Sequence, residues 1–206
     1  PSSDNLAELK KLADQAGISR INGNMTISAA DIDTISAYGN LTTSNNYINF
    51  TLDNSVSVSQ AATLAGKTSG TVAYDQGISD SISAFASASA RTNNFNAALA
   101  KDATVDVTVT GTQTTADHIS ALNLIVAGQT SGQVTATISA NKTIVAGLSG
   151  FTNKALNTTV SDRMSVSEFD TLNAATSVNV VLTAGLEDSL GNLAPGGSVA
   201  SGVTAA

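Results

Sequence analysis

The chain contains no cysteine and no tryptophan, and its 206 residues include only two prolines and one histidine. The absence of cysteine excludes disulfide bonds, thiolate metal ligands and cysteine nucleophiles. The absence of cysteine does not indicate a cellular compartment, because a chain of this length can fold without cross-links. Apolar residues make up 42% of the chain, whereas aromatic residues make up 4% and charged residues 12%. The apolar side chains are therefore mostly small aliphatic ones, and we expect a thin core.

Basic residues are also scarce. Nine Lys and Arg residues stand against sixteen Asp and Glu residues, which gives a formal net charge of −7. An acidic protein repels nucleic acid and anionic membrane surfaces, and no basic cluster opposes this effect. No apolar run reaches the roughly 20 residues that are needed to cross a bilayer. We therefore expect neither nucleic-acid binding nor membrane insertion.

Short segments of strict alternation recur along the chain. In Ile48–Leu52, Val105–Thr110 and Val134–Ser139 every second side chain is apolar, and the residues between are Thr, Asn, Asp or Ser. Such alternation predicts strands with one buried face and one hydrated face. We expect strands at residues 25–27, 47–52, 71–74, 105–110, 134–139, 158–161 together with 164–166, and 178–183.

Helix signals lie between these segments. Leucines and alanines recur at helical spacing over residues 5–16, with Ser3 or Asp4 available as N-cap and Gly17 just past the end. Later helices are predicted to open with Asp variants of the capping box, in which a hydroxyl and an acidic side chain each satisfy a backbone N–H group. The expected boxes are Ser28–Asp31, Thr114–Asp117 and Ser167–Asp170.

The segments also repeat. Residues 65–72 resemble residues 127–134 at an offset of 62, and Met25–Ser28 resembles Val56–Ser59 at an offset of 31. Half of 62 is 31, so we predict a repeating coil of about 31 residues. Met164–Ser167 carries the same phrase, but its offset from Val56 is 108, which is not a multiple of 31. The repeat is therefore degenerate.

A repeat of strand and helix favours an α/β architecture. The Thr, Asn and Asp positions in the strands contradict helices on both faces of the sheet. We predict a one-sided, mainly parallel β/α solenoid with short helices or irregular turns. We expect an N-terminal helical cap or linker at residues 1–20, a solenoid domain at 21–190 and a flexible linker at 191–206. The alternative is a set of all-β sandwich-like modules.

The sequence offers little support for catalysis. His118 follows Asp117, but neighbours in a helix do not face each other, and no nucleophilic serine motif is present. Pairs of carboxylates occur, yet five Phe, three Tyr and no Trp suit a sugar-cleaving cleft poorly. We therefore predict no enzyme, with a carbohydrate-active enzyme as a remote alternative.

Calcium is the one cofactor that the composition leaves open. Hard cations take oxygen ligands from Asp, Asn and backbone carbonyl groups, and these side chains are frequent here. Neither an EF-hand loop nor the calcium-binding nonapeptide occurs in the sequence. Helix caps and hydrated acids are the simpler explanation, and we predict no other cofactor.

The hydrated sheet face provides the candidate binding residues. Its outward row comprises Thr108, Thr110, Thr135 and Thr137. Such a row can form a flat lattice of hydroxyl and methyl groups suited to ice or crystalline carbohydrate, although the high β propensity of Thr explains it more simply. Tyr47 and Tyr74 are the candidate residues for stacking against a glycan, with core packing as the alternative for each.

Three phrases carry a resemblance to known proteins. Residues 103–112, 132–139 and 172–180 resemble degenerate Ala/Ser/Thr-rich repeats of very large surface or secreted proteins of marine bacteria, notably cyanobacteria and their phages. The resemblance spans most of residues 21–190, and it concerns amino-acid composition and the spacing of the repeated segments. It implies an extracellular or cell-surface segment, structural or adhesive, as in an S-layer-like coat, a filament or a fibre.

Two functional hypotheses follow. The first is a structural repeat module that assembles with like subunits, because open sheet edges expose unpaired N–H and C=O groups that invite another strand. The second is an adhesin or phage-fibre domain that binds a cell-surface glycan through the polar sheet face. Ice binding is a less favoured reading of the same face.

Overall fold

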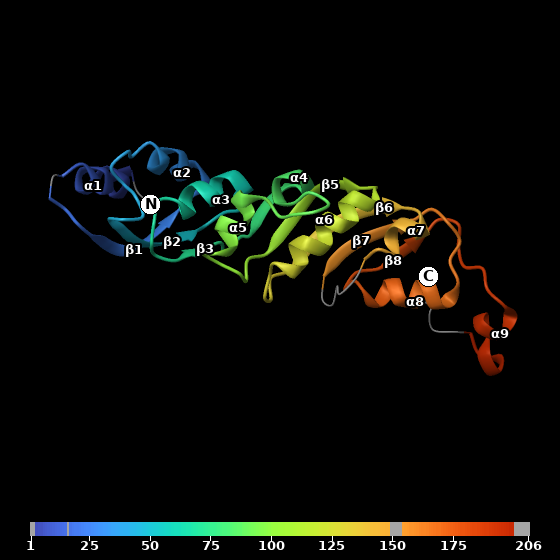
Figure 1. Ribbon diagram of the computed structural model, residues 1–206. Helices are drawn as coiled ribbons and strands as arrows, with labels where there is room; N and C mark the ends of the chain where they lie inside the picture. Colours follow the sequence, from blue (N-terminus) through green and yellow to red (C-terminus); the bar gives the residue numbers. More distant parts are fainter. Residues whose placement is uncertain (1–2, 16, 149–153, 200–206) are drawn as a thin grey trace. The chain divides into compact units, whose positions relative to one another are not determined.

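The computed structural model describes residues 3–15, 17–148 and 154–199, in which strands and helices alternate (Figure 1). The strands are β1 (Ile21–Ile27), β2 (Asn46–Leu52), β3 (Val72–Ala73), β4 (Ile78–Ser81), β5 (Val107–Gln113), β6 (Val134–Ala140), β7 (Ala155–Val160) and β8 (Val180–Leu182). The α-helices are α1 (Ser3–Asp14), α2 (Ala29–Ser36), α3 (Val58–Ala65), α4 (Ile82–Phe85), α5 (Asn93–Leu99), α6 (Ala116–Ala127), α7 (Lys142–Val145), α8 (Val166–Ala174) and α9 (Leu190–Leu193). A short 3-10 helix, η1, covers Pro195–Gly197.

The strands form two sheets. One sheet has the order β1-β2-β3 and the other has the order β4-β5-β6-β7-β8. The pairs β1/β2, β2/β3, β6/β7 and β7/β8 are parallel. This is the predicted α/β class with parallel pairing. The all-β alternative does not describe the fold, because helices lie between most successive strands.

The chain divides into two compact units. The first comprises residues 1–80, 91–108 and 128–132, and the second comprises residues 81–90, 109–127 and 133–206. This division differs from the cap, repeat domain and linker expected from the sequence. The region expected to be a linker contains most of α9 and all of η1.

The predicted alternation of buried and hydrated side chains is confirmed in both units. In β2, Phe50 is buried and its neighbour Asn49 is exposed, and in β6, Ile138 is buried and Thr137 is exposed. Thr158 of β7 is an exception, since it is 1% exposed and its hydroxyl donates to the Leu156 carbonyl at 3.1 Å. One face of each sheet therefore packs in the core while the other carries polar side chains.

Four phenylalanines anchor an otherwise aliphatic core. Phe50 and Phe95 of the first unit and Phe85 and Phe169 of the second are all fully buried. A buried aromatic side chain removes far more apolar surface from water than an alanine or valine does. Each of these four side chains therefore contributes more to the core than a small aliphatic side chain does, in a chain in which only 4% of residues are aromatic.

The spacing between paired strands is shorter than the predicted period of 31. The register places Asn46 opposite Ile21, Val72 opposite Phe50, Ala155 opposite Thr135, and Val180 opposite Thr158. Paired residues are thus 25, 22, 20 and 22 positions apart. The predicted coil length is wrong for these pairs.

The predicted period is wrong because similar sequence segments have different structural roles. Met25 lies within β1, whereas Val56 makes a single bridge to Ile78 and is followed at once by Ser57, the N-cap of α3. The offset of 31 therefore aligns a strand with a helix start. Met164 likewise makes a single bridge, so the strand expected at residues 164–166 does not form.

Strand pairings of the first unit recur in the second unit at an offset of 108 residues. The register of β7 against β8 repeats that of β2 against β3, since Thr158 and Val180 follow Phe50 and Val72 at this same offset. The bridges Val56–Ile78 and Met164–Leu186 share it. So do backbone hydrogen bonds of 2.7 Å from Ser69 to Asn46 and from Ser177 to Lys154. Residues 46–80 of the first unit and 154–188 of the second thus share these contacts.

The predicted capping boxes are confirmed in part. Ser28 and Asp31 form the expected box at the start of α2. The box of α8 is Ser165 with Glu168, two residues before the expected position, because the strand-like pairing ends at Met164. Ser57 and Gln60 form a further box at α3 that the sequence analysis missed.

Helix α1 begins and ends two residues earlier than expected. Ser3 and Asp4 lie inside the helix, so neither is the predicted N-cap. Leu6 and Leu9 are buried, and the hydroxyl of Tyr38 donates to the Leu6 carbonyl at 3.0 Å, which ties α1 to the segment after α2. Helix α1 therefore packs beside α2, yet no strand precedes it in the described residues.

Candidate functional site

A groove lies in the first unit between α1 and the outer edge of β1. It has a volume of about 500 Å3. Helix α1 contributes Glu8, Leu9 and Leu12, and β1 contributes residues 21–26. Leu12 is 42% exposed, which is high for a leucine in an apolar helix stripe. Among the described residues no strand precedes α1, and the groove runs along the open side of β1 beneath this helix.

The backbone of β1 can pair with a strand in this groove. Ile21 donates its N–H to the Asn45 carbonyl, and the Ile27 carbonyl accepts from Asp53, so both residues bond toward β2. In a parallel ladder alternate residues bond to the same neighbour. The N–H groups of Asn22, Asn24 and Thr26 consequently point away from β2. β1 is the edge strand of its sheet, so these donors have no strand partner among the described residues.

The large aliphatic residues that are exposed lie in the first helix and in the last part of the described chain. Apart from Leu12 in α1, the described residues expose Val181 in β8 by 53%, Leu190 in α9 by 80% and Val199 by 58%. β8 is the edge strand of the other sheet. Each sheet therefore ends on an open strand with exposed apolar side chains nearby. Sequence reasoning predicted open edges in general but not this groove, whose only signal was the narrow apolar stripe of α1.

The predicted threonine row is on the hydrated side of the strands. Thr110 and Thr137 of the second unit are exposed and Thr135 is half-buried, while Thr108 of the first unit is exposed. In the register of β6 against β7, Thr135 lies opposite Ala155 and Thr137 lies opposite Asn157. The row therefore does not continue as threonine onto β7.

The two tyrosines proposed for glycan stacking have different environments. Tyr74 is 2% exposed and its hydroxyl donates to the Ala61 carbonyl at 3.1 Å. Burial, with a smaller effect from the negative charge of Asp102, raises the pKa of Tyr74 well above its ordinary value. Tyr74 is thus a core residue and offers no face to a ligand. Tyr47 is half-buried, and the Arg20 guanidinium lies 4.0 Å from the centre of its ring.

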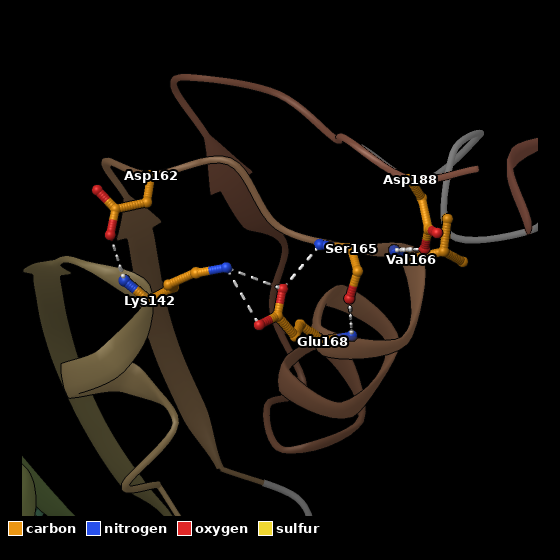
Figure 2. Close-up of polar contacts among 6 residues, drawn as sticks. All are labelled: Lys142, Asp162, Ser165, Val166, Glu168 and Asp188. Atoms are coloured by element: carbon orange, nitrogen blue, oxygen red, sulfur yellow. Dashed lines mark hydrogen bonds and ion pairs between the residues drawn. The ribbon is translucent and has the colours of Figure 1, made fainter. Parts of the chain in front are cut away.

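Carboxylates in the second unit cap helices (Figure 2). Glu168 accepts from the backbone N–H of Ser165 at 2.8 Å and pairs with Lys142 at 3.3 Å. Asp162 accepts from the N–H of Lys142 at 3.2 Å, and this N–H belongs to the first residue of α7. The first turn of a helix leaves such N–H groups without internal partners. These acids therefore stabilise helix starts, the role that sequence reasoning gave as the simpler alternative to calcium binding.

Hydrogen bonds lower the pKa of two carboxylates in the second unit, Glu168 and Asp188. The bonds from Ser165 and Lys142 hold the pKa of Glu168 below its ordinary value of 4.5. Hydrogen bonds from Asn192 and Ser189, and to a lesser extent from Val166, hold the pKa of Asp188 below 3.8. Both carboxylates are consequently ionised at neutral pH and keep their caps in place.

His118 takes part in a helix cap. Its Nδ1 atom accepts from the backbone N–H of Thr114 at 3.2 Å, and its own backbone N–H donates to the Thr115 hydroxyl at 3.2 Å. The cap of α6 is thus centred on Thr115, one residue later than predicted. Because this ring nitrogen accepts a hydrogen bond from the backbone, the imidazole of His118 has a structural role at the start of α6.

The described residues provide no group of three or more His, Cys, Asp or Glu side chains arranged to hold a metal ion. Within the same residues, no helix combines the length and apolar character that a membrane span requires.

Comparisons with known proteins give no relative for this chain. No protein-family model matches it, and neither curated proteins nor solved structures provide a match.

Proposed function

We propose that the chain is a non-enzymatic structural module, a one-sided β/α solenoid that assembles with like subunits through its open strand edges. Support for the solenoid comes from parallel strands in which paired residues are 20 to 25 positions apart, and from matching contacts at an offset of 108. These spacings are within the range of known solenoid repeats. In such an array each repeat buries its apolar side only against its neighbours.

The groove between α1 and β1 is the observation that carries the proposal. It combines a free strand edge, which supplies hydrogen bonds, with the 42% exposed side chain of Leu12, which supplies apolar contact. Addition of a strand to a sheet edge uses these two contributions. The groove lies within the first unit and is complete there.

The proposed occupant is the β8 edge of a second copy. β8 is an edge strand, and its half-buried Leu182 lies on the same face as the buried Val180, so packing of this face against Leu12 would remove apolar surface from water on both sides. Contact between two different surfaces of identical subunits produces an open filament when the rotation does not close a ring. A filament or layer at the cell surface, as the resemblance implies, is the setting that we propose.

The experiment is a measurement of mass by light scattering and sedimentation over a wide range of chain concentration. We expect the mass to rise with concentration. The variant Met25→Lys places a charge in the groove and should remain monomeric, because an inward charge on an edge strand opposes pairing. Thr137→Lys adds the same charge on an exposed site of β6, away from an edge, and should assemble like the parent chain. A parent chain that stays monomeric throughout would exclude the proposal.

A further inference from the structure

A second feature of the first unit has a different chemistry. On the polar side of the three-stranded sheet, an open depression of about 530 Å3 is bounded by residues of β1, β2 and the segment before β3. The residues that matter for its chemistry are Arg20, Asn22, Asn24, Tyr47, Asn49 and Thr71. The depression shares Asn22 and Asn24 of the edge strand β1 with the groove, but its chemistry comes from their side chains, whereas the assembly proposal uses their backbone N–H groups.

Arg20 is held in place on one side. Its guanidinium carbon lies 4.0 Å from the centre of the Tyr47 ring, and its Nε donates to the Asn22 side-chain oxygen at 2.7 Å. These contacts orient the guanidinium plane and leave its two terminal amino groups with no protein partner among the described residues. A planar fork of N–H donors matches the two oxygens of a carboxylate.

The asparagines of the depression use their oxygens internally. The Asn24 oxygen accepts from the Asn49 side-chain amide at 2.9 Å, and the Asn49 oxygen accepts from the backbone N–H of Thr71 at 3.0 Å. The Asn22 oxygen accepts from Arg20. The N–H donors of the Arg20 fork and of the Asn22 and Asn24 amides therefore remain for a ligand.

The spacing of these donors favours an extended ligand rich in oxygen. Asn22 and Asn24 are two residues apart on β1, so their side chains are separated by about 7 Å. A lone acetate-sized anion cannot reach both. A pyranose ring with a carboxylate and several hydroxyl groups can place one oxygen group at Arg20 and others along the strand.

The electrostatics of the depression favour a carboxylate at Arg20. The residues that line the depression include Arg20 and no Asp or Glu, although the chain as a whole carries a net charge of −7. The depression is thus locally positive within an acidic protein. A ligand with dense sulfate or phosphate groups would be repelled by the rest of the surface.

We propose that this depression binds a carboxylated oligosaccharide, with a uronic-acid carboxylate on the Arg20 fork and neighbouring sugar oxygens on the amides of Asn22 and Asn24. The Tyr47 ring acts as a positioning residue, because it supports the guanidinium plane from beneath. A glycan-binding role of this kind places Arg20 at the centre of the site, whereas sequence reasoning had placed only Tyr47 there.

The test is calorimetric titration with trigalacturonate at a chain concentration where the protein is monomeric. The fully methyl-esterified trisaccharide is the matched ligand control, since it keeps the sugar rings and removes the charges. We expect the ester to bind at least about tenfold more weakly, the difference typical of losing one charge-assisted hydrogen bond. The variant Arg20→Gln should weaken trigalacturonate binding by a similar factor, and Arg20→Lys should not restore it fully.

The variant Arg163→Gln provides a control, because it removes one exposed arginine from the second unit and preserves the depression. It should bind trigalacturonate like the parent chain. Equal binding of acid and ester, full binding by Arg20→Gln, equal binding of a triglutamate peptide, or no binding of trigalacturonate would each overturn the proposal.

Discussion

The Asp188 carboxylate accepts a hydrogen bond of 3.1 Å from the backbone N–H of Val166, the first residue of α8 (Figure 2). The two residues are 22 positions apart, the same distance that separates paired residues of β7 and β8. The side chain that follows one strand thus caps the helix that follows the previous strand. This contact links successive segments through polar atoms as well as through the core.

The same contact occurs at three other helices. The N–H groups at the starts of α2, α3 and α7 donate to side chains 20 to 25 positions later, at 2.8 to 3.2 Å. The pairs are Ala29 with Asn54, Val58 with Asp80, and Lys142 with Asp162. Since both Asn and Asp serve, the contact needs an acceptor oxygen and not a charge.

The first prediction concerns this contact. Asp162→Ala should lower the free energy of unfolding by about 1 kcal/mol, because the N–H of Lys142 loses its acceptor. Asp162→Asn should cost much less, since Asn54 performs the same role at α2. Urea unfolding of the two variants measures the difference. Equal losses in both variants would mean that the charge, and not the acceptor oxygen, is what matters.

The second prediction tests close approach of backbone segments. A Cβ atom on Gly132 would lie 2.0 Å from the Val105 carbonyl oxygen, and one on Gly70 would lie 2.3 Å from that of Ile48. Gly132→Ala and Gly70→Ala should each destabilise the chain by about 1 to 3 kcal/mol or more, as overpacking does. Gly39→Ala meets nothing within 4 Å and should be nearly neutral. Thermal unfolding distinguishes them, and a harmless Gly132→Ala would show that these segments are farther apart.

The third prediction tests the equivalence at an offset of 108. The Thr68 hydroxyl donates to the Ile48 carbonyl at 2.7 Å and accepts from the Gly70 N–H at 2.9 Å. Thr176 makes the corresponding contacts with Leu156 at 3.0 Å and Val178 at 3.3 Å.

Both hydroxyls satisfy backbone groups at the same place in the two units. Thr68→Val and Thr176→Val should each cost about 1 to 3 kcal/mol, because they leave these groups without a partner. Thr63→Val serves as the control, since it removes a hydroxyl that donates only to the Ser59 carbonyl within its own helix. The free energies of unfolding come from chemical denaturation. A large loss at only one of the two threonines would contradict the equivalence.

The fourth prediction concerns acid. The folded-state pKa of Glu168 lies below its unfolded value of 4.5, so the ionised carboxylate stabilises the fold above pH 4.5. That contribution is lost as the pH falls through the folded pKa. Glu168→Gln should keep the capping box, as Gln60 does at α3, and should lose less stability on acidification than the parent chain. Denaturant unfolding at neutral and at acidic pH measures this. An identical acid response in the variant would contradict the cap.

The local features of the fold were predictable where they depend on short stretches of sequence. The alternation in Val134–Ser139 predicted the bounds of β6 to within one residue, and the capping box at Ser28 predicted the start of α2. The start of α8 was missed by two residues because the signal at Ser167 competes with the better one at Ser165. β4 was missed because Ile78–Ser81 has little alternation.

The way in which the segments pack against one another was harder to predict from the sequence. The separation of paired residues depends on where each strand pairs, and similar phrases at Met25 and Val56 gave the wrong period. The contact of Arg20 with Tyr47 joins residues 27 positions apart, and no local pattern marks it. Tyr74 and Tyr47 both lie in strand-like stretches of the sequence, and only the fold shows that Tyr74 is buried.

The most direct test of the assembly proposal is residue-resolved hydrogen exchange of the β1 amides at low and at high chain concentration. The N–H groups of Asn22, Asn24 and Thr26 point toward the groove, while that of Ile21 bonds to Asn45. If a strand of a second copy enters the groove, the three outward amides should exchange at least about tenfold more slowly at high concentration, with Ile21 as the internal reference. Unchanged exchange at these three amides in an assembled sample would contradict strand addition at β1.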